Sequence, residues 1–146
     1  MTVRKVPGRL PVGFRYTPGV ANTAFFDALR DRGVLLGSRC ESCGVTYLPA
    51  RLFCERCFGE LAADVECGPE GTLESWSVSH VDVDGRRLDA PVRLGLARMD
   101  GADTVLLHLL LDSSEPRIGM RVRAVFRDDR AGSIDDLRGF APVEAG

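Results

Sequence analysis

The amino-acid sequence predicts a mainly β protein with one short N-terminal helix, a small cysteine-rich module and a five-stranded barrel. Four cysteines stand in two Cys-X-X-Cys pairs with ten residues between the pairs: Cys40, Cys43, Cys54 and Cys57. Five short apolar runs follow within about 70 residues, with no helical pattern between them. We therefore expect three parts: an arm and short helix over residues 1–33, the cysteine-rich module over 34–66 and the barrel over 67–142.

The bulk composition suits a folded protein of this size. The chain has 146 residues, of which 45% are apolar, enough for a packed core. No stretch approaches the roughly 20 consecutive apolar residues that a membrane-spanning helix needs. The N-terminal segment is basic but is interrupted by Pro7, Pro11 and Pro18, and it lacks the apolar run of a secretory signal. We expect a cytoplasmic protein.

Charge is unevenly distributed along the chain. The net charge of −2 argues against a general nucleic-acid binder. Residues 1–60 contain nine Lys and Arg against five Asp and Glu, whereas residues 61–146 contain ten against sixteen. The basic half could therefore face an anionic ligand or partner.

The first part of the chain predicts an arm followed by a helix. Residues 1–20 contain three prolines and three glycines without sustained periodicity, so they form either a disordered tail or an arm that packs along a partner. Asn22 or Thr23 can cap a helix that runs to about Arg32, because a side-chain oxygen satisfies a free N–H of the first turn. Gly33 then provides the usual stop.

Three large apolar side chains share one face of this short helix: Phe25, Phe26 and Leu29. Such a face has to be covered. Either the rest of this chain or a partner could cover it, and we treat the three residues as a candidate partner interface.

The cysteine pairs lie on two turns that a hairpin can bring together. Residues 34–36 predict a short strand that leads into the first pair, and residues 45–49 predict a hairpin-like stretch between the pairs. Gly44 lets the backbone curl after the first pair. Phe58 stands at the equivalent place after the second pair, so we expect that turn to be less regular.

Two thiolates on each of two tight turns can complete a tetrahedron of sulfur around one zinc ion. Four sulfur ligands leave no open position for water or substrate, so the predicted zinc is structural. The alternatives are two disulfides in a secreted domain, which the cytoplasmic signs disfavour, and iron held by the same thiolates. No βαβ unit surrounds either pair, which argues against a thioredoxin-like redox role.

The five runs of the barrel part are residues 72–81, 92–99, 104–111, 120–127 and 137–140. Alternation is clearest in the fourth run, where Val122, Ala124 and Phe126 share one face. Turn signals separate the runs at positions 84–85, 100–101, 118–119 and 131–132. Short strands without intervening helices suit a small closed or half-closed barrel.

No active site can be assembled from the remaining candidates, and we predict no catalytic residue. Cys67 is left over from the pairs and is expected to be a small buried side chain. The only histidines, His80 and His108, both fall in predicted strands, where a structural role is expected. The chain contains no Gly-X-Ser-X-Gly, phosphate-binding glycine loop or His-Glu-X-X-His motif.

Six segments in order resemble the zinc-ribbon/OB-fold proteins associated with acyl-CoA metabolism: FFDAL (25–29), GSRCESCG (37–44), LPARLFC (48–54), GTLESWSV (71–78), IGMRV (118–122) and LRGF (137–140). The resemblance covers most of the chain, from about residue 16 to residue 140. It implies a helical N-terminal hairpin, a rubredoxin-like zinc ribbon and a five-stranded OB-fold barrel. Ala50 departs from the pattern, since a second proline is common there.

The resemblance also implies a function. Proteins of this kind are non-catalytic small subunits of thiolase-superfamily enzymes, which include thiolases, acyl-CoA aldolases and acyltransferases. They support a thiolase-like large subunit, in a heterotetramer by our expectation, and help to shape its acyl-CoA site. Arginines beside the ribbon could meet a phosphate of coenzyme A, and Arg51 is our candidate.

Two other functions remain open from the sequence. Zinc ribbons and OB barrels also occur in single-stranded nucleic-acid-binding proteins, although the barrel half here is acidic and has no ladder of aromatic residues for base stacking. The other is a rubredoxin-like electron carrier, which would bind iron instead of zinc. An iron tetrathiolate is red and a zinc one is colourless, so the colour of the protein distinguishes them.

Overall fold

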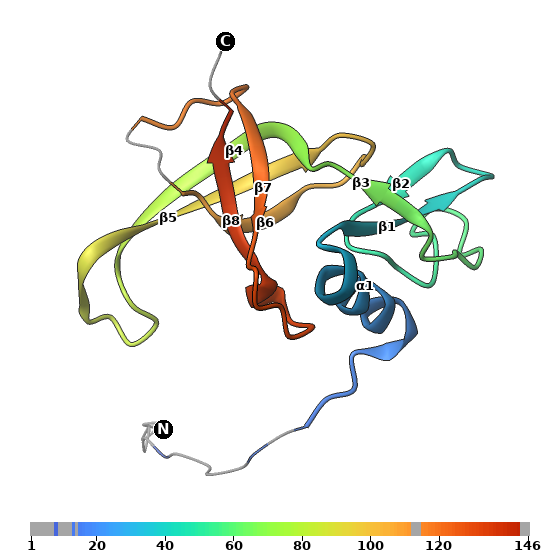
Figure 1. Ribbon diagram of the computed structural model, residues 1–146, viewed down its shortest axis with the longest axis horizontal. Helices are drawn as coiled ribbons and strands as arrows, with labels where there is room; N and C mark the ends of the chain where they lie inside the picture. The colour runs from blue at the N-terminus through green and yellow to red at the C-terminus, as the bar shows by residue number, and fades with distance from the viewer. Residues whose placement is uncertain (1–7, 9–12, 14, 112–114, 144–146) are drawn as a thin grey trace, which may run out of the picture.

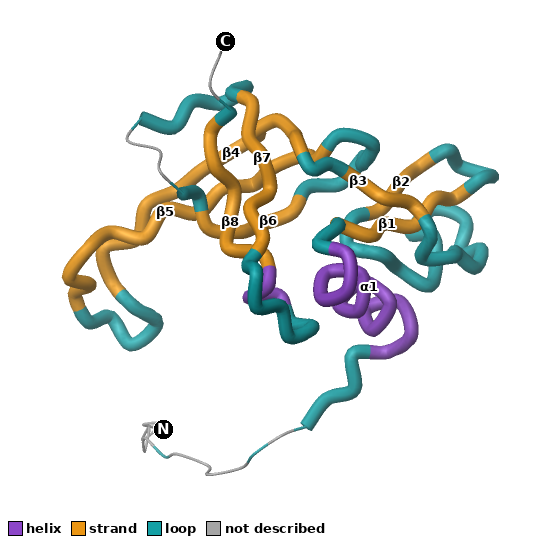
Figure 2. Tube along the Cα trace, in the orientation of Figure 1, coloured by secondary structure: helices purple, strands orange, loops and turns teal. Residues whose placement is uncertain are grey.

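The computed structural model describes residues 8, 13, 15–111 and 115–143. The elements of these residues are α1 (Gly19–Arg32), β1 (Leu35–Cys40), β2 (Val45–Tyr47), β3 (Val65–Cys67), β4 (Glu70–Val81), β5 (Arg87–Met99), β6 (Leu106–Leu109), β7 (Arg121–Phe126), the 3-10 helix η1 (Ile134–Asp136) and β8 (Leu137–Pro142). Figure 1 shows the ribbon sheet on one side, the barrel on the other and α1 below the junction. The mainly β fold with an N-terminal helix is confirmed (Figure 2).

Helix α1 begins earlier than predicted. Pro18 has φ −68° and ψ −13°, so the residue before Gly19 already has a helical backbone, and no side chain caps the helix. The predicted cap at Asn22 or Thr23 is therefore wrong, because both residues lie inside the helix. The end at Arg32 is as predicted. The arm lies mostly outside the described residues.

The apolar face of α1 is covered by this chain itself. Phe25 and Leu29 are 1% and 0% exposed and belong to the same buried cluster as Leu35 and Leu48. Only Phe26 keeps part of its surface, with its ring edge-on to Phe25 at 5.6 Å between centroids. The prediction of a partner interface is thus corrected for Phe25 and Leu29, whose side chains are needed to join helix and ribbon.

The ribbon sheet has the strand order β2-β1-β3, with all pairs antiparallel. The strand β3 was not predicted, because a three-residue strand shows no alternation in sequence. Cys67 at its end pairs with Leu35 and is 4% exposed, so it is the buried side chain that was expected. Gly37 permits the close approach of the strands, since a Cβ there would lie 2.6 Å from the carbonyl oxygen of Tyr47.

The second sheet contains the five predicted strands in the order β6-β5-β4-β7-β8, all antiparallel. A parallel bridge between Leu110, just after β6, and Phe140 of β8 joins the two edges of this sheet into a barrel. Its interior is filled by side chains with no exposed surface, among them Leu73, Ala97 and Phe140. Beyond the barrel, β4 and β5 continue as a projecting hairpin (Figure 1).

A loop of the barrel part pairs with the outer edge of the ribbon. The N–H of Thr46 donates to the Asp103 carboxylate at 2.8 Å, and the N–H of Asp103 donates to the Thr46 carbonyl at 2.9 Å. The Thr104 hydroxyl accepts from the N–H of Leu48 at 2.8 Å and lies 2.9 Å from the Leu48 carbonyl, to which it donates. These four bonds, the ribbon–barrel latch, satisfy backbone groups of β2 and its continuation that would otherwise be open.

No helix in the described part of the chain is both long and apolar enough to cross a bilayer.

Candidate metal centre

The four paired cysteines converge at one end of the ribbon. Cys40 ends β1, Cys43 lies on the turn to β2, and Cys54 and Cys57 lie on a second turn. Their sulfur atoms all lie within 4.8 Å of one another. Within the described residues this is the one group of His, Cys, Asp and Glu side chains arranged to share a metal ion.

The two turns have the same backbone form. The N–H of Gly44 donates to the Cys40 carbonyl at 2.7 Å, and the N–H of Phe58 donates to the Cys54 carbonyl at 2.9 Å. Gly44 has φ 67° and Phe58 has φ 58°, so both occupy the left-handed region. The second turn is therefore as regular as the first, but there a phenylalanine adopts a conformation that favours glycine.

The four sulfurs differ in exposure. Cys54 is 0% and Cys40 3% exposed, whereas Cys43 is half-buried and Cys57 is exposed. The buried Cys54 sulfur lies 3.3 Å from the Tyr47 hydroxyl and 3.4 Å from the backbone nitrogen of Arg56, whose N–H donates to it. One side of the site thus lies in the ribbon interior and the other at its surface.

Contact among the thiols separates their pKa values. The hydrogen bond from Tyr47, followed by backbone bonds, lowers the pKa of Cys54 to about 6. The hydrogen bond with Cys57, followed by burial, raises the pKa of Cys43 to about 12. Four thiolates cannot coexist in such a small volume without a compensating cation, which a bound divalent metal provides. Soft sulfur donors on two tight turns fit zinc.

Arg51, the candidate for a coenzyme A contact, is part of the ribbon's own structure. Its guanidinium lies over the Tyr47 ring, 5.0 Å from the centroid, and forms an ion pair with Glu55. Its backbone N–H donates to the Ser38 hydroxyl at 2.8 Å. Because its side chain remains 40% exposed, the guanidinium is still accessible from solvent.

The histidines and the fifth cysteine do not come together with the metal centre. Burial lowers the pKa of His108, and its Nδ1 is buried without a hydrogen-bond partner. The imidazole is edge-on to Phe140, with 6.3 Å between the ring centroids. His80 is exposed on the projecting hairpin. Burial also raises the pKa of Cys67, as expected for a thiol inside an apolar core.

The surface around the centre carries exposed apolar side chains that were not among the predicted site residues. Leu52, Phe53 and Phe58 are 41%, 53% and 78% exposed, and all three lie on or beside the second cysteine turn. We call them the ribbon apolar patch. The sequence contains one signal of this patch: Phe58 follows the second cysteine pair at the position where Gly44 follows the first.

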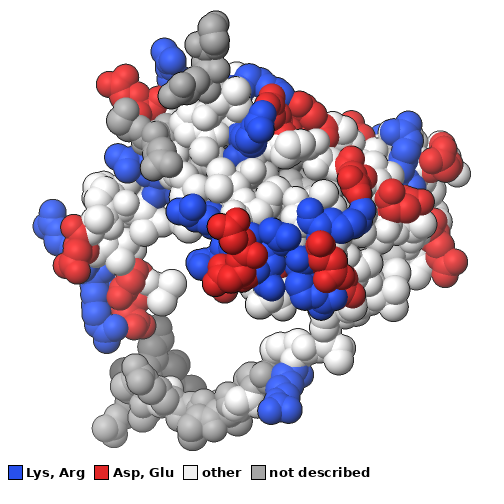
Figure 3. All heavy atoms as spheres, in the orientation of Figure 1, with Lys and Arg blue, Asp and Glu red and all other residues white. Residues whose placement is uncertain are grey.

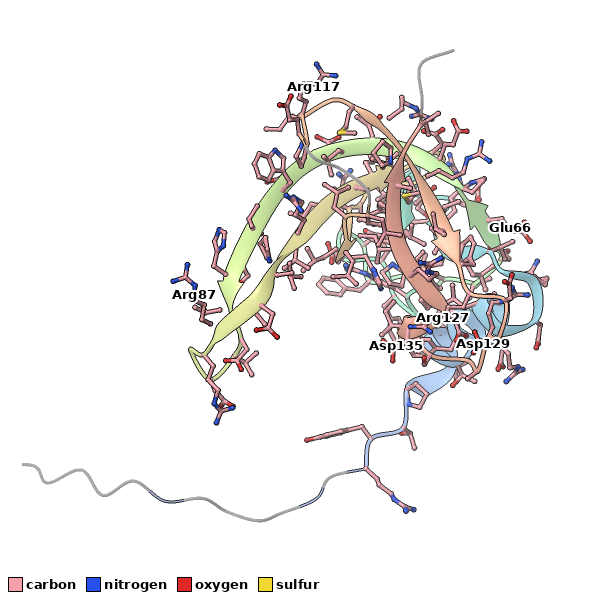
Figure 4. The ribbon with its side chains drawn as sticks, turned by 60° about the vertical axis from the view of Figure 1, so that its left-hand side comes forward. Glu66, Arg87, Arg117, Arg127, Asp129 and Asp135 are labelled. Atoms are coloured by element: carbon pink, nitrogen blue, oxygen red, sulfur yellow. The ribbon has the colours of Figure 1, made fainter. Side chains whose placement is uncertain are left out.

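Charges are mixed on the face that Figure 3 displays. Basic and acidic side chains alternate there instead of forming separate fields. Figure 4 illustrates this near β8, where Arg127, Asp129 and Asp135 lie close together, while Arg87 lies far away on the projecting hairpin. The opposite net charges of the two halves of the sequence therefore do not form two large single-sign surfaces on this face.

Comparison with protein families matches both parts of the chain in order. Residues 27–62 match the rubredoxin-like zinc ribbon domain of ChsH2, and residues 64–127 match the C-terminal OB-fold domain of ChsH2. Together with the sulfur cluster, the ribbon match confirms structural zinc as the cofactor.

Two curated relatives are named DUF35 domain-containing scaffold proteins. The protein of Methanocaldococcus jannaschii is 27% identical over 122 residues, which are 80% of this chain and 86% of the relative. The protein of Methanothermobacter thermautotrophicus is 28% identical over 106 residues, 70% of this chain and 79% of the relative.

Two solved structures are also similar. A DUF35 family protein of unknown function from Sulfolobus solfataricus is 29% identical, with a TM-score of 0.62 over 73% of this chain and 78% of the other. The Ltp2–ChsH2(DUF35) aldolase has a TM-score of 0.65 over 88% of this chain and 98% of the matched chain. Its 22% identity supports the likeness in fold alone.

Proposed function

Because the chain belongs to the zinc-ribbon/OB-fold accessory proteins with the two ChsH2 domains, we propose that it is a non-catalytic subunit of a heteromeric acyl-CoA thiolase or acyl-CoA aldolase. The observation that carries the proposal is the match to DUF35 relatives named scaffold proteins, over most of their length and of this chain. Its role would be to stabilise a thiolase-like subunit and to help form that subunit's acyl-CoA site. A cytoplasmic location stays a prediction.

The ribbon apolar patch supports contact with a partner. Exposed phenylalanines beside a closed metal site contribute nothing to this chain's core, and apolar aromatic side chains are enriched in protein interfaces. Phe26 is the only residue of the original interface candidate that keeps accessible surface. We propose the patch as a contact surface for the large subunit.

Co-expression with a thiolase-like protein encoded by a neighbouring gene tests the assignment. We expect the two chains to co-purify, the thiolase-like chain to lose solubility when this chain is omitted, and acyl-CoA turnover to require both. A soluble, fully active large subunit without this chain would contradict the proposal. Salt-dependent retention on single-stranded DNA would instead favour the nucleic-acid-binding alternative, and we expect none.

We also propose that Arg51 meets a phosphate of coenzyme A in the assembled complex. The phosphate would compete with the Glu55 carboxylate for the Arg51 guanidinium, whose paired N–H groups can bind either anion. Arg51→Ala should weaken acyl-CoA binding by the complex about tenfold. The matched control is Arg87→Ala on the distant hairpin (Figure 4), which should have no effect. Unchanged affinity in an intact, zinc-loaded Arg51→Ala complex would contradict the contact.

A further inference from the structure

Tyr47 is a buried aromatic residue whose hydroxyl is not needed for packing. Its side chain is 2% exposed and lies in the apolar cluster of the ribbon with Cys40, Val45 and Cys54. A phenylalanine would fill the same volume and bury the same ring. The buried hydroxyl therefore has to be explained by its own contacts, since burying a polar group without partners is unfavourable.

The hydroxyl oxygen has two neighbours. The backbone N–H of Glu55 donates to it at 3.2 Å, so the oxygen already accepts one bond. The second neighbour is the Cys54 sulfur, 3.3 Å away. The hydroxyl keeps its proton free to donate, and by distance alone either the hydroxyl or a thiol could be the donor between these two atoms.

The direction of this bond follows from the chemistry of the centre. A cysteine that binds zinc has lost its proton and can only accept a hydrogen bond. Cys54 is 0% exposed, so water does not reach this side of the site. Its sulfur accepts backbone bonds from Arg56 and Cys57, and the Tyr47 hydroxyl provides the side-chain donor.

The Arg51 guanidinium lies over the Tyr47 ring and strengthens the same arrangement. It lies 5.0 Å from the Tyr47 centroid and is held by Glu55, which follows Cys54 in the chain. A cation over a phenol ring withdraws electron density and makes the O–H a better donor.

We propose that the Tyr47 hydroxyl is a positioning group of the zinc site. It donates a hydrogen bond to the Cys54 thiolate, holds that sulfur in its place in the tetrahedron and withdraws charge from it. Outer hydrogen bonds of this kind orient metal ligands and tune the metal.

Tyr47→Phe tests the proposal, because it removes only the hydroxyl. Competition with a chromogenic chelator should show zinc affinity lower by roughly tenfold or more. After substitution with Co²⁺, the sulfur-to-cobalt charge-transfer band should move to longer wavelength, because a thiolate without the hydrogen bond is the stronger electron donor. Tyr16→Phe, which removes the other tyrosine hydroxyl, is the matched control and should change neither measurement.

Wild-type zinc affinity and an unmoved cobalt band in Tyr47→Phe would overturn the proposal. A loss of affinity with an unmoved band would also overturn it, since that result indicates a packing defect. If Tyr47→Phe fails to fold, 3-fluorotyrosine incorporated into the Tyr16→Phe background replaces only Tyr47 with a more acidic phenol. That stronger donor should move the cobalt band to shorter wavelength, and an unmoved band would again contradict the role.

Discussion

At the scale of single residues, Phe58 combines an unfavourable backbone with an exposed aromatic ring. Its φ of 58° is the only positive value among the described residues other than glycine, and its side chain is 78% exposed. The left-handed conformation costs a residue with a Cβ about 1–2 kcal/mol. Gly44 shows that the equivalent turn is made without that cost. A phenylalanine at position 58 thus lowers the free energy of unfolding of the free protein relative to a glycine there.

Phe58→Gly should therefore separate stability from assembly. The zinc-loaded variant should unfold at a higher temperature by a few degrees, with a gain of up to about 1 kcal/mol, since the relief of strain exceeds the added freedom of the unfolded chain. Its affinity for the thiolase-like partner should fall, because the ring of the ribbon apolar patch is lost. Calorimetry and binding titration measure the two effects.

Phe53→Ala is the matched control. It shortens another member of the patch without changing a left-handed residue, so it should weaken assembly and leave the melting temperature nearly unchanged. A destabilised Phe58→Gly protein would show that the turn is not strained.

At the scale of elements, the cysteine end of the ribbon depends on its metal more than on apolar packing. The cluster there consists of four buried residues, two of which are the zinc ligands Cys40 and Cys54, whereas Leu35 and Leu48 belong to the larger cluster shared with α1. So small a cluster buries little surface, and in such modules the free energy of metal binding becomes free energy of folding.

Removal of zinc should therefore unfold residues 34–60 and abolish partner binding. Amide exchange should show loss of protection in β1 and β2, whereas the barrel interior should remain protected. Release to a chelator should be faster at pH 5 than at pH 8. Protons compete with zinc for thiols such as Cys43, whose pKa is raised to about 12, and below pH 6 they also compete for Cys54. A chelated sample that still assembled normally would contradict this expectation.

Much of this element pattern could be predicted from the sequence, because it rests on local signals. The spacing of the cysteines predicts the metal centre, and apolar runs between turn residues predict the five barrel strands. The strand β3 and the bond between Tyr47 and Cys54 could not be predicted, since each depends on where distant segments meet. Periodicity correctly predicted that Phe25 and Leu29 share a buried face of the helix. It could not show that this face packs against the same chain, because periodicity does not identify what covers a face.

At the scale of the whole molecule, the ribbon–barrel latch makes two modules behave as one. Thr104→Val should remove both bonds of its hydroxyl and leave the N–H and carbonyl of Leu48 unsatisfied. We expect a loss of about 1–3 kcal/mol in the free energy of unfolding. Denaturant titration should also resolve separate transitions for ribbon and barrel. Thr104→Ser keeps the hydroxyl and should remain near wild type; equal losses in both variants would contradict the role of these bonds.

The same latch limits how such proteins can be recombined. A ribbon grafted onto a foreign barrel would lose the carboxylate of Asp103 and the hydroxyl of Thr104, which come from sequence more than 50 residues downstream. Exchange at the short connection between ribbon and barrel would then leave backbone groups of β2 open to other chains. A functional chimera therefore has to take the loop between β5 and β6 from the same protein as the cysteines. The segments that have to be transferred together are not contiguous in the sequence.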